Sequence, residues 1–246
     1  MNTEPSLRRR ALVTGGSGGI GRAIAERLAR DGAHVIVHAN TRLDAAEAIA
    51  ATIVADGGSA EAVAFDVTDR SAAGSACAAL VAAAGAIQIV VNNAGVHDDA
   101  AFPALREDQW QRVIDVSLNG FFNVTQPLVM PMIRTRWGRI INLSSVAAIA
   151  GNRGQVNYAA AKGAINSATK ALALELASRG ITVNAVAPGL IDAGMAAAID
   201  QATIEKIVPM KRAGSAAEVA ALVAFLACDD AAYISGQVIS INGAMI

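Results

Sequence analysis

Residues 11–21 read ALVTGGSGGIG, a short apolar run that passes directly into a glycine-rich loop. The residues that follow, 22–29, place apolar side chains at helical spacing, so the loop joins a strand to a helix. Glycines at such a junction permit a tight turn and let a pyrophosphate reach the amides at the helix N-terminus. The stretch therefore predicts a dinucleotide-binding unit, with its contacts at Gly15, Ser17, Gly18, Gly19, Ile20 and Gly21.

The alternation of strand and helix continues along the chain. Apolar runs typical of strands occur at 11–14, 34–38, 62–66, 87–92, 138–143, 181–186 and 237–241. Helical patterns lie between them, near 19–30, 43–56, 70–84, 106–133, 155–178 and 215–227. This order predicts an α/β fold, a Rossmann-type doubly wound parallel sheet of about seven strands with helices on both faces. We expect residues 1–246 to form one domain, with a frayed tail at 1–6.

A second group of polar residues follows the fifth expected strand. Tyr158 and Lys162 are four residues apart in an expected helix, so their side chains share one face. A lysine cation beside a phenol favours the phenolate and lowers the pKa of the tyrosine, which can then exchange a proton near neutral pH. Ser145 precedes Tyr158 by thirteen residues and could hold a substrate oxygen. The three residues together indicate proton transfer to or from a carbonyl oxygen.

The end of the second expected strand bears on the choice of nucleotide. Folds of this kind usually carry an acidic residue there, which binds the ribose 2′-hydroxyl of NAD. This chain has Asn40, Thr41 and Arg42 after Ala39 instead. Arg42 could pair with a 2′-phosphate, and Asn40 and Thr41 could donate hydrogen bonds. We therefore predict NADP(H) in preference to NAD(H), the alternative being that Arg42 caps a solvated turn.

With these motifs the chain resembles the short-chain dehydrogenase/reductase family, from about Arg10 to the C-terminus. The residues that carry the resemblance are Thr14-Gly15 through Gly21, Asp66-Val67, Asn92-Asn93-Ala94-Gly95, Ser145, Tyr158 with Lys162, and Pro188-Gly189. Within the family, residues 151–158, 177–184 and Asn242-Gly243 are most similar to the 3-oxoacyl-[acyl-carrier-protein] reductases. Residues 97–103 and 237–242 are similar to the branch that serves aryl-polyene pigment synthesis.

The resemblance implies a role for each matched residue. Tyr158 would donate the proton, Lys162 would contact the nicotinamide ribose, and Ser145 would hydrogen-bond the carbonyl. The cofactor site would also include Asp66, Val67, Asn93, Ala94, Gly95, Pro188, Gly189 and Ile191. Arg136 and Arg179 would present cations to an acyl carrier protein that bears the 3-oxoacyl substrate. Similar reductases pair through the helices at 106–133 and 155–178, which implies a homotetramer or a dimer.

Two positions depart from the family pattern. Ser117 stands where the family has an Asn, which completes the catalytic tetrad by holding a water beside the lysine. Ser is shorter, so the proton relay would be weakened or bridged by another water. Ala193 replaces a Thr that hydrogen-bonds the nicotinamide carboxamide, and one such bond is worth about 0.5–1.5 kcal/mol. Three interpretations stay open: the carrier-linked reductase, a reductase or dehydrogenase of free ketones or alcohols, and a weakly active cofactor-binding partner subunit.

The charge and composition of the chain bear on its binding partners and its location in the cell. The net charge of −1 gives no reason to expect nucleic acid. The longest uncharged stretch, 71–97, is broken at Gly85 and runs into a strand, so we expect no membrane span. Cys77 and Cys228 are interpreted as reduced thiols, and the three histidines lack metal-ligand spacing. No secretory signal is visible, which predicts a cytoplasmic protein, and residues 190–212 are predicted to form a substrate lid.

Overall fold

The computed structural model describes residues 8–193 and 200–246. In this part of the chain, seven parallel strands form one sheet in the order β3-β2-β1-β4-β5-β6-β7. The strands are β1 (Arg10–Val13), β2 (His34–Ala39), β3 (Ser59–Ala64), β4 (Ile89–Asn92), β5 (Gly138–Leu143), β6 (Ile181–Pro188) and β7 (Val238–Ile241). The predicted doubly wound fold is confirmed, and its strand order reverses between β1 and β4, where such folds bind their ligands.

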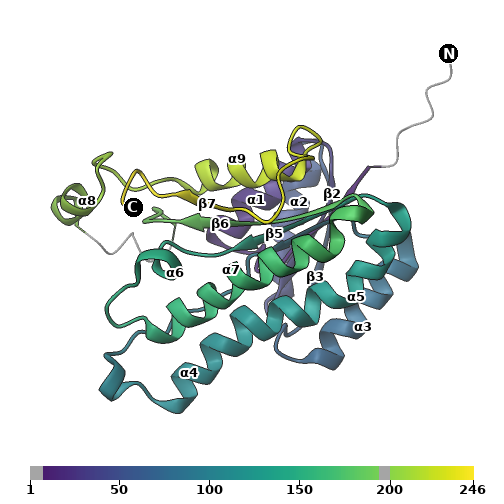
Figure 1. The fold of residues 1–246 in the computed structure, drawn as a ribbon. Helices are drawn as coiled ribbons and strands as arrows, with labels where there is room; N and C mark the ends of the chain where they lie inside the picture. The colour runs from purple at the N-terminus through teal and green to yellow at the C-terminus, as the bar shows by residue number, and fades with distance from the viewer. Residues whose placement is uncertain (1–7, 194–199) are drawn as a thin grey trace.

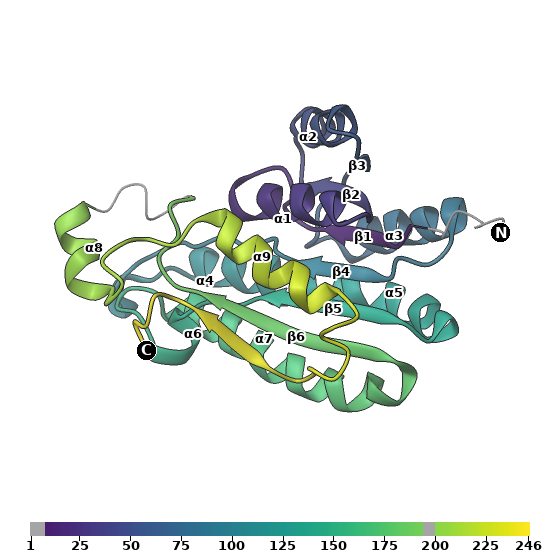
Figure 2. The ribbon, with the colours of Figure 1, turned by 90° about the horizontal axis from the view of Figure 1, so that it is seen from above.

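Helices cover both faces of the sheet (Figures 1 and 2). One face carries α1 (Gly19–Arg30), α2 (Leu43–Ala55) and α9 (Ala216–Ala227), and the other carries α3 (Arg70–Ala84), α5 (Gly120–Thr135) and α7 (Val156–Leu176). Side chains of one strand alternate between the two cores: Ala11 and Val13 point to the first, Leu12 to the second. Both faces are therefore buried, which is why the strands appear in the sequence as continuous apolar runs.

The helix predicted at 106–133 is confirmed as one continuous helical stretch, from Glu107 to Thr135, but it contains a π-helical turn that the sequence did not predict. The structure has α4 (Glu107–Ile114), a π-helical turn (Asp115–Asn119) and then α5. The backbone passes close to a neighbour where α5 begins, since a Cβ at Gly120 would lie 2.9 Å from Val67 Cγ2. A π turn adds a residue without ending the helix, and it often marks a functional position.

The predicted bounds of the third strand are also wrong, because β3 spans Ser59–Ala64 instead of 62–66. β3 is an edge strand that pairs with β2 alone, so its polar residue Glu61 reaches solvent and accepts from Arg10. Short elements that the sequence did not predict are α6 (Ala147–Ala150), α8 (Gln201–Ile207) and 3₁₀ turns at Phe102–Ala104 and Ala177–Arg179. None of the helices in the described ranges has both the length and the apolar character needed to cross a membrane.

Candidate active site

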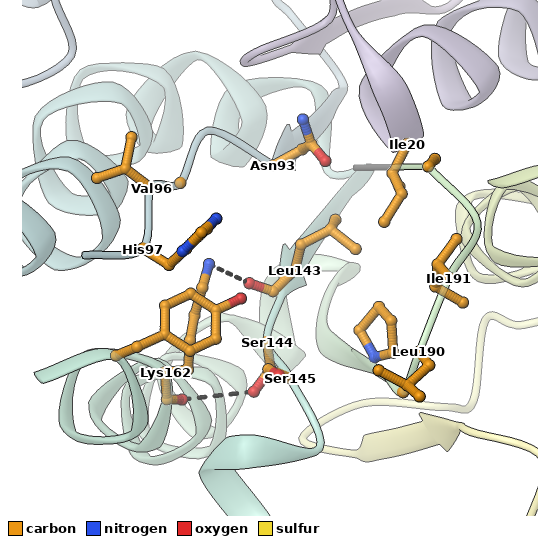
Figure 3. A pocket seen from close by; sticks show the side chains of 15 residues that line it. Ile20, Asn93, Val96, His97, Leu143, Ser144, Ser145, Lys162, Leu190 and Ile191 are labelled. Carbon is orange, nitrogen blue, oxygen red and sulfur yellow. Dashed lines mark hydrogen bonds between the residues drawn. The ribbon is translucent and has the colours of Figure 1, made fainter. Parts of the chain in front are cut away.

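A cavity of about 280 Å³ opens at the carboxyl ends of the strands (Figure 3). Its walls come from the β1–α1 loop, the segment after β4, the end of β5, helix α7 and the segment after β6. Predicted site residues that line it are Ser145, Tyr158, Lys162, Ile20, Asn93, Gly95, Pro188, Gly189 and Ile191. His97 and Leu190, which the sequence placed in the similar stretch 97–103 and in the predicted lid, also line it, as do Val96, Leu143 and Ser144, which the sequence did not single out. The structure thus brings together three of the four predicted catalytic residues.

Lys162 is buried beneath this cavity. Its Nζ donates to the carbonyl oxygen of Leu143 at 2.8 Å. The backbone of Gly95 passes directly over the ammonium group, since a Cβ built there would lie 3.2 Å from Nζ. Burial lowers the pKa of Lys162 to about 8. The side chain therefore carries its charge at neutral pH and releases its proton under mildly alkaline conditions.

Tyr158 differs from the expectation that a nearby lysine lowers its pKa. Burial raises the pKa of Tyr158 above its usual value of 10.0; Ser145 acts in the lowering direction and Asp99 in the raising direction. The predicted lowering is wrong for this structure, because the Lys162 ammonium bonds to a carbonyl and lies 5.7 Å from the centre of the phenol ring. Tyr158 therefore keeps its proton at neutral pH, as a proton donor must.

The loop between β1 and α1 has the shape that a pyrophosphate requires. No side chain caps the start of α1 at Gly18, so the first amides of the helix remain free for an anion. Gly15 adopts φ +61°, a conformation that favours glycine. At Gly21 a Cβ would overlap the Gly15 carbonyl oxygen and lie 2.6 Å from Asn93 Nδ2. The predicted glycine residues thus fit a bound dinucleotide.

The segment after β4 holds this loop in place. Asn93 Nδ2 donates to the carbonyl oxygens of Thr14, at 2.9 Å, and Gly15, at 3.1 Å. The Thr14 hydroxyl in turn accepts from the backbone amides of Asn93 and Ala94, both at 3.0 Å. The supporting role that the family resemblance implied for Asn93 and Ala94 agrees with these bonds. Asn93 and Ala94 thus form hydrogen bonds with Thr14 and Gly15 of the glycine-rich loop.

His38 is a further support that the sequence did not indicate. The amide of Gly15 donates to His38 Nδ1 at 3.1 Å, so Nδ1 acts as an acceptor and the ring proton is on Nε2. Nε2 donates to the carbonyl oxygen of Phe65 at 2.8 Å. Burial lowers the pKa of His38, which keeps the ring neutral. Its signal in the sequence is a polar residue that directly follows the apolar run Val35–Val37.

The residues predicted for the adenosine end of the cofactor lie beyond the ends of β2 and β3. Asn40, Thr41 and Arg42 are exposed, and Arg42 forms no ion pair within residues 8–193 and 200–246. Asp66 Oδ1 accepts from the amide and the hydroxyl of Thr68, both at 2.8 Å, so this carboxylate fixes a turn. Val67 is buried beside Gly120.

The two positions that depart from the family pattern, Ser117 and Ala193, differ in their distance from the cavity. Ser117 lies buried in the π-helical turn, and its hydroxyl has no hydrogen-bond partner in the described ranges. It does not line the cavity. Ala193 does line the cavity, close to Gly19 at the start of α1. Ala193 therefore lies at the cavity, whereas Ser117 is connected to it only indirectly, because its π-helical turn packs against α7, which carries Tyr158 and Lys162.

Arg136 and Arg179 lie far from the cavity. Arg136 precedes β5 and Arg179 precedes β6, so both are at the amino-terminal edge of the sheet, opposite Ser145. The structure does bring them together, since Arg136 Nη2 donates to the carbonyl oxygen of Ser178 at 3.4 Å. Helix α7, with 21 residues and so about 30 Å long, separates this edge from Tyr158. Within one chain the two arginines cannot contact a substrate in the cavity.

The predicted lid at 190–212 falls partly outside the described residues. Residues 194–199 are outside, including Met195 and Ile199, as is the tail at 1–6. In the part that is described, Ile191 pairs with Gly214 in a short bridge and α8 follows. Ile191 and Ala193 form one wall of the cavity. A lid function for the segment stays a prediction.

The fold and the site together define a dinucleotide-dependent oxidoreductase. The family model of the short chain dehydrogenases matches residues 9–203, and the chain belongs to this family. A 3-oxoacyl-[acyl-carrier-protein] reductase FabG of Aggregatibacter actinomycetemcomitans is 49% identical over 238 residues, covering 95% of this chain and 98% of the relative. The reductase of the same name from Pseudomonas aeruginosa is 42% identical and covers 96% of both chains.

A solved structure is also similar over nearly the whole chain. The crystal structure of a "putative gluconate dehydrogenase" from Agrobacterium tumefaciens superposes with a TM-score of 0.93 at 36% identity. The match covers 96% of this chain and 95% of that one. The family assignment and the Rossmann-type fold therefore agree with each other, and the protein is an oxidoreductase of the short-chain dehydrogenase/reductase type.

Proposed function

We propose that the protein reduces the 3-oxo group of an acyl thioester, carried on acyl carrier protein, to the 3-hydroxy form with NADPH. The observation that carries the proposal is the convergence of Ser145, Tyr158 and Lys162 on one cavity beside the glycine-rich loop. The similarity to reductases named for this substrate, at 42–49% identity over nearly the full length, supports the choice of substrate. The expected location remains the cytoplasm.

The residues of the cavity divide the chemistry between them. When bound, the reduced nicotinamide supplies the electrons and the hydrogen that the carbonyl carbon receives. Ser145 holds the carbonyl oxygen, and Tyr158, whose pKa burial keeps high, gives that oxygen its proton. Lys162 places a positive charge beside the oxygen as negative charge develops there. The Gly15–Gly21 loop and the start of α1 would hold the pyrophosphate.

The preference for NADPH rests on the end of β2. An exposed Arg42 without an ion pair in the described residues can pair with a 2′-phosphate, and residues 40–42, which directly follow the strand, include no carboxylate. Arg42→Ala should raise the KM for NADPH about tenfold and leave that for NADH unchanged. Arg30→Ala, at the end of α1, is the control. Equal effects on both nucleotides would contradict the assignment.

The docking of the carrier protein requires a second copy of the chain. Exposed apolar side chains lie on α5, where Phe122 and Met130 are 44% and 56% exposed, and on α7, where Leu174 is 85% exposed. Antiparallel pairing of these helices with those of a second copy would bring Arg136 and Arg179 of one copy toward Tyr158 of the other. The exposed apolar side chains support the dimer or tetramer that the family resemblance implies, and the proposed pairing would dock the carrier across two chains.

Two sets of variants test the proposal. Tyr158→Phe should abolish ketone reduction and leave NADPH binding intact, and retained turnover would refute the assigned chemistry. Arg136→Glu with Arg179→Glu should weaken the use of carrier-linked substrate and spare a free 3-oxoacyl thioester. Equal loss on both substrates would argue against carrier docking at these residues. Arg8→Glu with Arg30→Glu, both exposed and without an ion pair in the described residues, is the control, because it makes the same change in net charge.

A second candidate is a dehydrogenase or reductase of free small molecules. It is favoured by the structural similarity to the Agrobacterium protein, whose name refers to gluconate, a free hydroxy acid. The comparison of a 3-oxoacyl thioester with a free hydroxy acid as substrate separates the two. The inactive partner subunit is less well supported, because the cavity retains Ser145, Tyr158 and Lys162 together.

A further inference from the structure

A second cavity lies at the amino-terminal ends of β5 and β6, at the opposite edge of the sheet from Tyr158. Its volume is about 460 Å³, which is larger than that of the candidate active site, and it has no part in the chemistry at Tyr158. Arg136 and Arg139 line it together with the aromatic side chains of Trp137 and Tyr233. A cavity of this size is in the range of sites that bind small organic molecules.

The guanidinium group of Arg139 is buried in the wall of this cavity and is incompletely hydrogen-bonded. Its side chain is 2% exposed. Nε donates to the carbonyl oxygen of Cys228 at 3.2 Å, and Nη1 donates to that of Gly138 at 2.9 Å. Nη2 forms no hydrogen bond with the described residues, and the carboxylate oxygen Oδ1 of Asp229 lies 3.6 Å from it. A buried cation with a free donor is unfavourable unless an acceptor reaches that donor.

Thr182 is a second buried donor beside this group. In the parallel pairing of β5 with β6, Thr182 is the register partner of Arg139, so the two side chains point to the same face of the sheet. Thr182 is 6% exposed and lines the cavity, and its hydroxyl has no hydrogen-bond partner in the described ranges. The Ser235 hydroxyl accepts from the amide of Val183 at 3.1 Å, which leaves its own proton for a further acceptor. Buried polar side chains are nearly always hydrogen-bonded, so these donors point to a ligand that accepts from them.

The charges that line the cavity favour an anion. The lining holds two cations, Arg136 and Arg139, and one carboxylate, Asp229. That carboxylate is already shared with Arg9, whose Nη2 donates to Oδ2 at 2.8 Å and to Oδ1 at 3.1 Å, and Trp137 Nε1 donates to Oδ1 at 3.0 Å. These hydrogen bonds from Arg9 and Trp137 lower the pKa of Asp229. Because Asp229 is occupied in this way, the cavity keeps an excess of positive charge.

We propose that this cavity binds a small organic phosphate, whose phosphate group accepts hydrogen bonds from Arg139, Thr182 and Ser235. A phosphate group has three strong acceptor oxygens, enough for donors that come from β5, β6 and the segment before β7, whereas a carboxylate has two. The phosphate group fills only part of the cavity. The remaining walls suit an aromatic or aliphatic body, because they include Ala177, Ile181, Ala232 and Tyr233. The inference goes beyond the proposed function and does not depend on it.

Calorimetric titration of the intact protein with phenyl phosphate tests the site, and benzoate is the carboxylate probe. Thr182→Val removes the hydroxyl at nearly constant shape, and Arg139→Lys keeps the charge but removes the guanidinium group. Thr52→Val is the matched control, because Thr52 is exposed on α2 and its hydroxyl donates within its own helix. Each titration is repeated with saturating NADP⁺, since a phosphate could also bind at the start of α1. Circular dichroism confirms that each variant is folded.

The expected result places phenyl phosphate in the cavity. It should bind with a Kd below about 1 mM in the presence and absence of NADP⁺, and Thr182→Val should raise this Kd about tenfold while Thr52→Val changes it less than about twofold. In Trp110→Phe, which leaves Trp137 as the single tryptophan, the ligand should change the intrinsic fluorescence.

Three results would overturn the inference. Loss of binding in the presence of NADP⁺ would place the phosphate at the glycine-rich loop. Equal affinity of wild type and Thr182→Val would exclude the cavity beside Thr182. Benzoate binding as tightly as phenyl phosphate would refute the assignment to a phosphate group.

Discussion

Lys162, and not Tyr158, should be the group that switches the enzyme off as the pH rises. Burial lowers the pKa of Lys162 to about 8, whereas burial raises the pKa of Tyr158. Lys162 therefore loses its charge before the phenol loses its proton. The cavity then lacks the cation that stabilises negative charge on the substrate oxygen. The kcat/KM for NADPH, which reports groups of the free enzyme, should fall about tenfold per pH unit above the pKa of Lys162.

The same lysine makes the stability of the fold depend on pH. The pKa of Lys162 is 10.5 in the unfolded reference and about 8 in the folded protein. Between these values the unfolded chain holds a proton that the folded chain has released, so the free energy of unfolding rises with pH in this window. At about 1.36 kcal/mol per unit of pKa, the whole window contributes about 3 kcal/mol. Below it, both states are protonated and the burial of the charge is fully unfavourable.

Lys162→Met removes both effects and so measures them. Urea unfolding of wild type and variant, at several pH values between 8 and 10.5, should show the wild type gaining about 3 kcal/mol relative to the variant. Lys170→Met is the matched control, because Lys170 is exposed on the same helix, and its stability curve should run parallel to that of wild type. If wild type and Lys162→Met show the same pH dependence, or if kcat/KM stays flat across this range, the reasoning from burial is refuted.

Three further predictions concern single side chains. Gly21→Ala should destabilise the fold by about 1–3 kcal/mol in thermal unfolding and weaken NADPH binding, because the added Cβ would overlap the Gly15 carbonyl oxygen. Gly18→Ala is the control, since a Cβ at Gly18 would have no atom within 4 Å and should leave the stability unchanged. An equal loss of stability in the two variants would contradict the steric argument. Burial lowers the pKa of His38 below 6.5, so the folded chain takes up the proton less readily than the unfolded chain. As the pH falls below 6.5, the free energy of unfolding of wild type should therefore decrease by up to about 1.4 kcal/mol per pH unit more than that of His38→Asn. Parallel plots of this free energy against pH would contradict the prediction. Ser117→Ala should lower kcat several-fold without lowering the melting temperature, since its hydroxyl has no hydrogen-bond partner in the described residues; an unchanged kcat would remove Ser117 from the catalytic set.

The sheet was predictable from the sequence because its strands are buried on both faces. Val90 and Val91 in β4, for example, are both fully buried although they point to opposite sides. Such strands form continuous apolar runs that stand out from the helical periodicity around them. β3 was placed less accurately because it lies at the edge, where Glu61 is tolerated. The π turn at Asp115–Asn119 could not be found, since one extra residue changes the helical pattern too little.

The positions of the proposed catalytic residues were predictable, and their protonation was not. A spacing of four residues on a helix fixes a shared face for Tyr158 and Lys162, whatever surrounds them. Their pKa values depend on how deeply each is buried and on the Leu143 carbonyl that draws the ammonium away from the phenol. Leu143 belongs to another strand, so no local pattern reveals this contact. His38 escaped notice for the same reason, because its partners Gly15 and Phe65 come from other segments.

The two opposite pKa shifts have one consequence for catalysis. Burial disfavours the charged forms of both Tyr158 and Lys162, so the phenol is kept neutral and the ammonium is held near the pH at which it would lose its proton. Within the described residues, Lys162 faces a carbonyl oxygen instead of a carboxylate, and its charge is therefore not neutralised. In the proposed mechanism, a negative charge that develops on the substrate oxygen supplies the missing counter-charge. The unfavourable burial of Lys162 is thus relieved in the transition state rather than in the resting protein, which is how a buried cation accelerates a reaction.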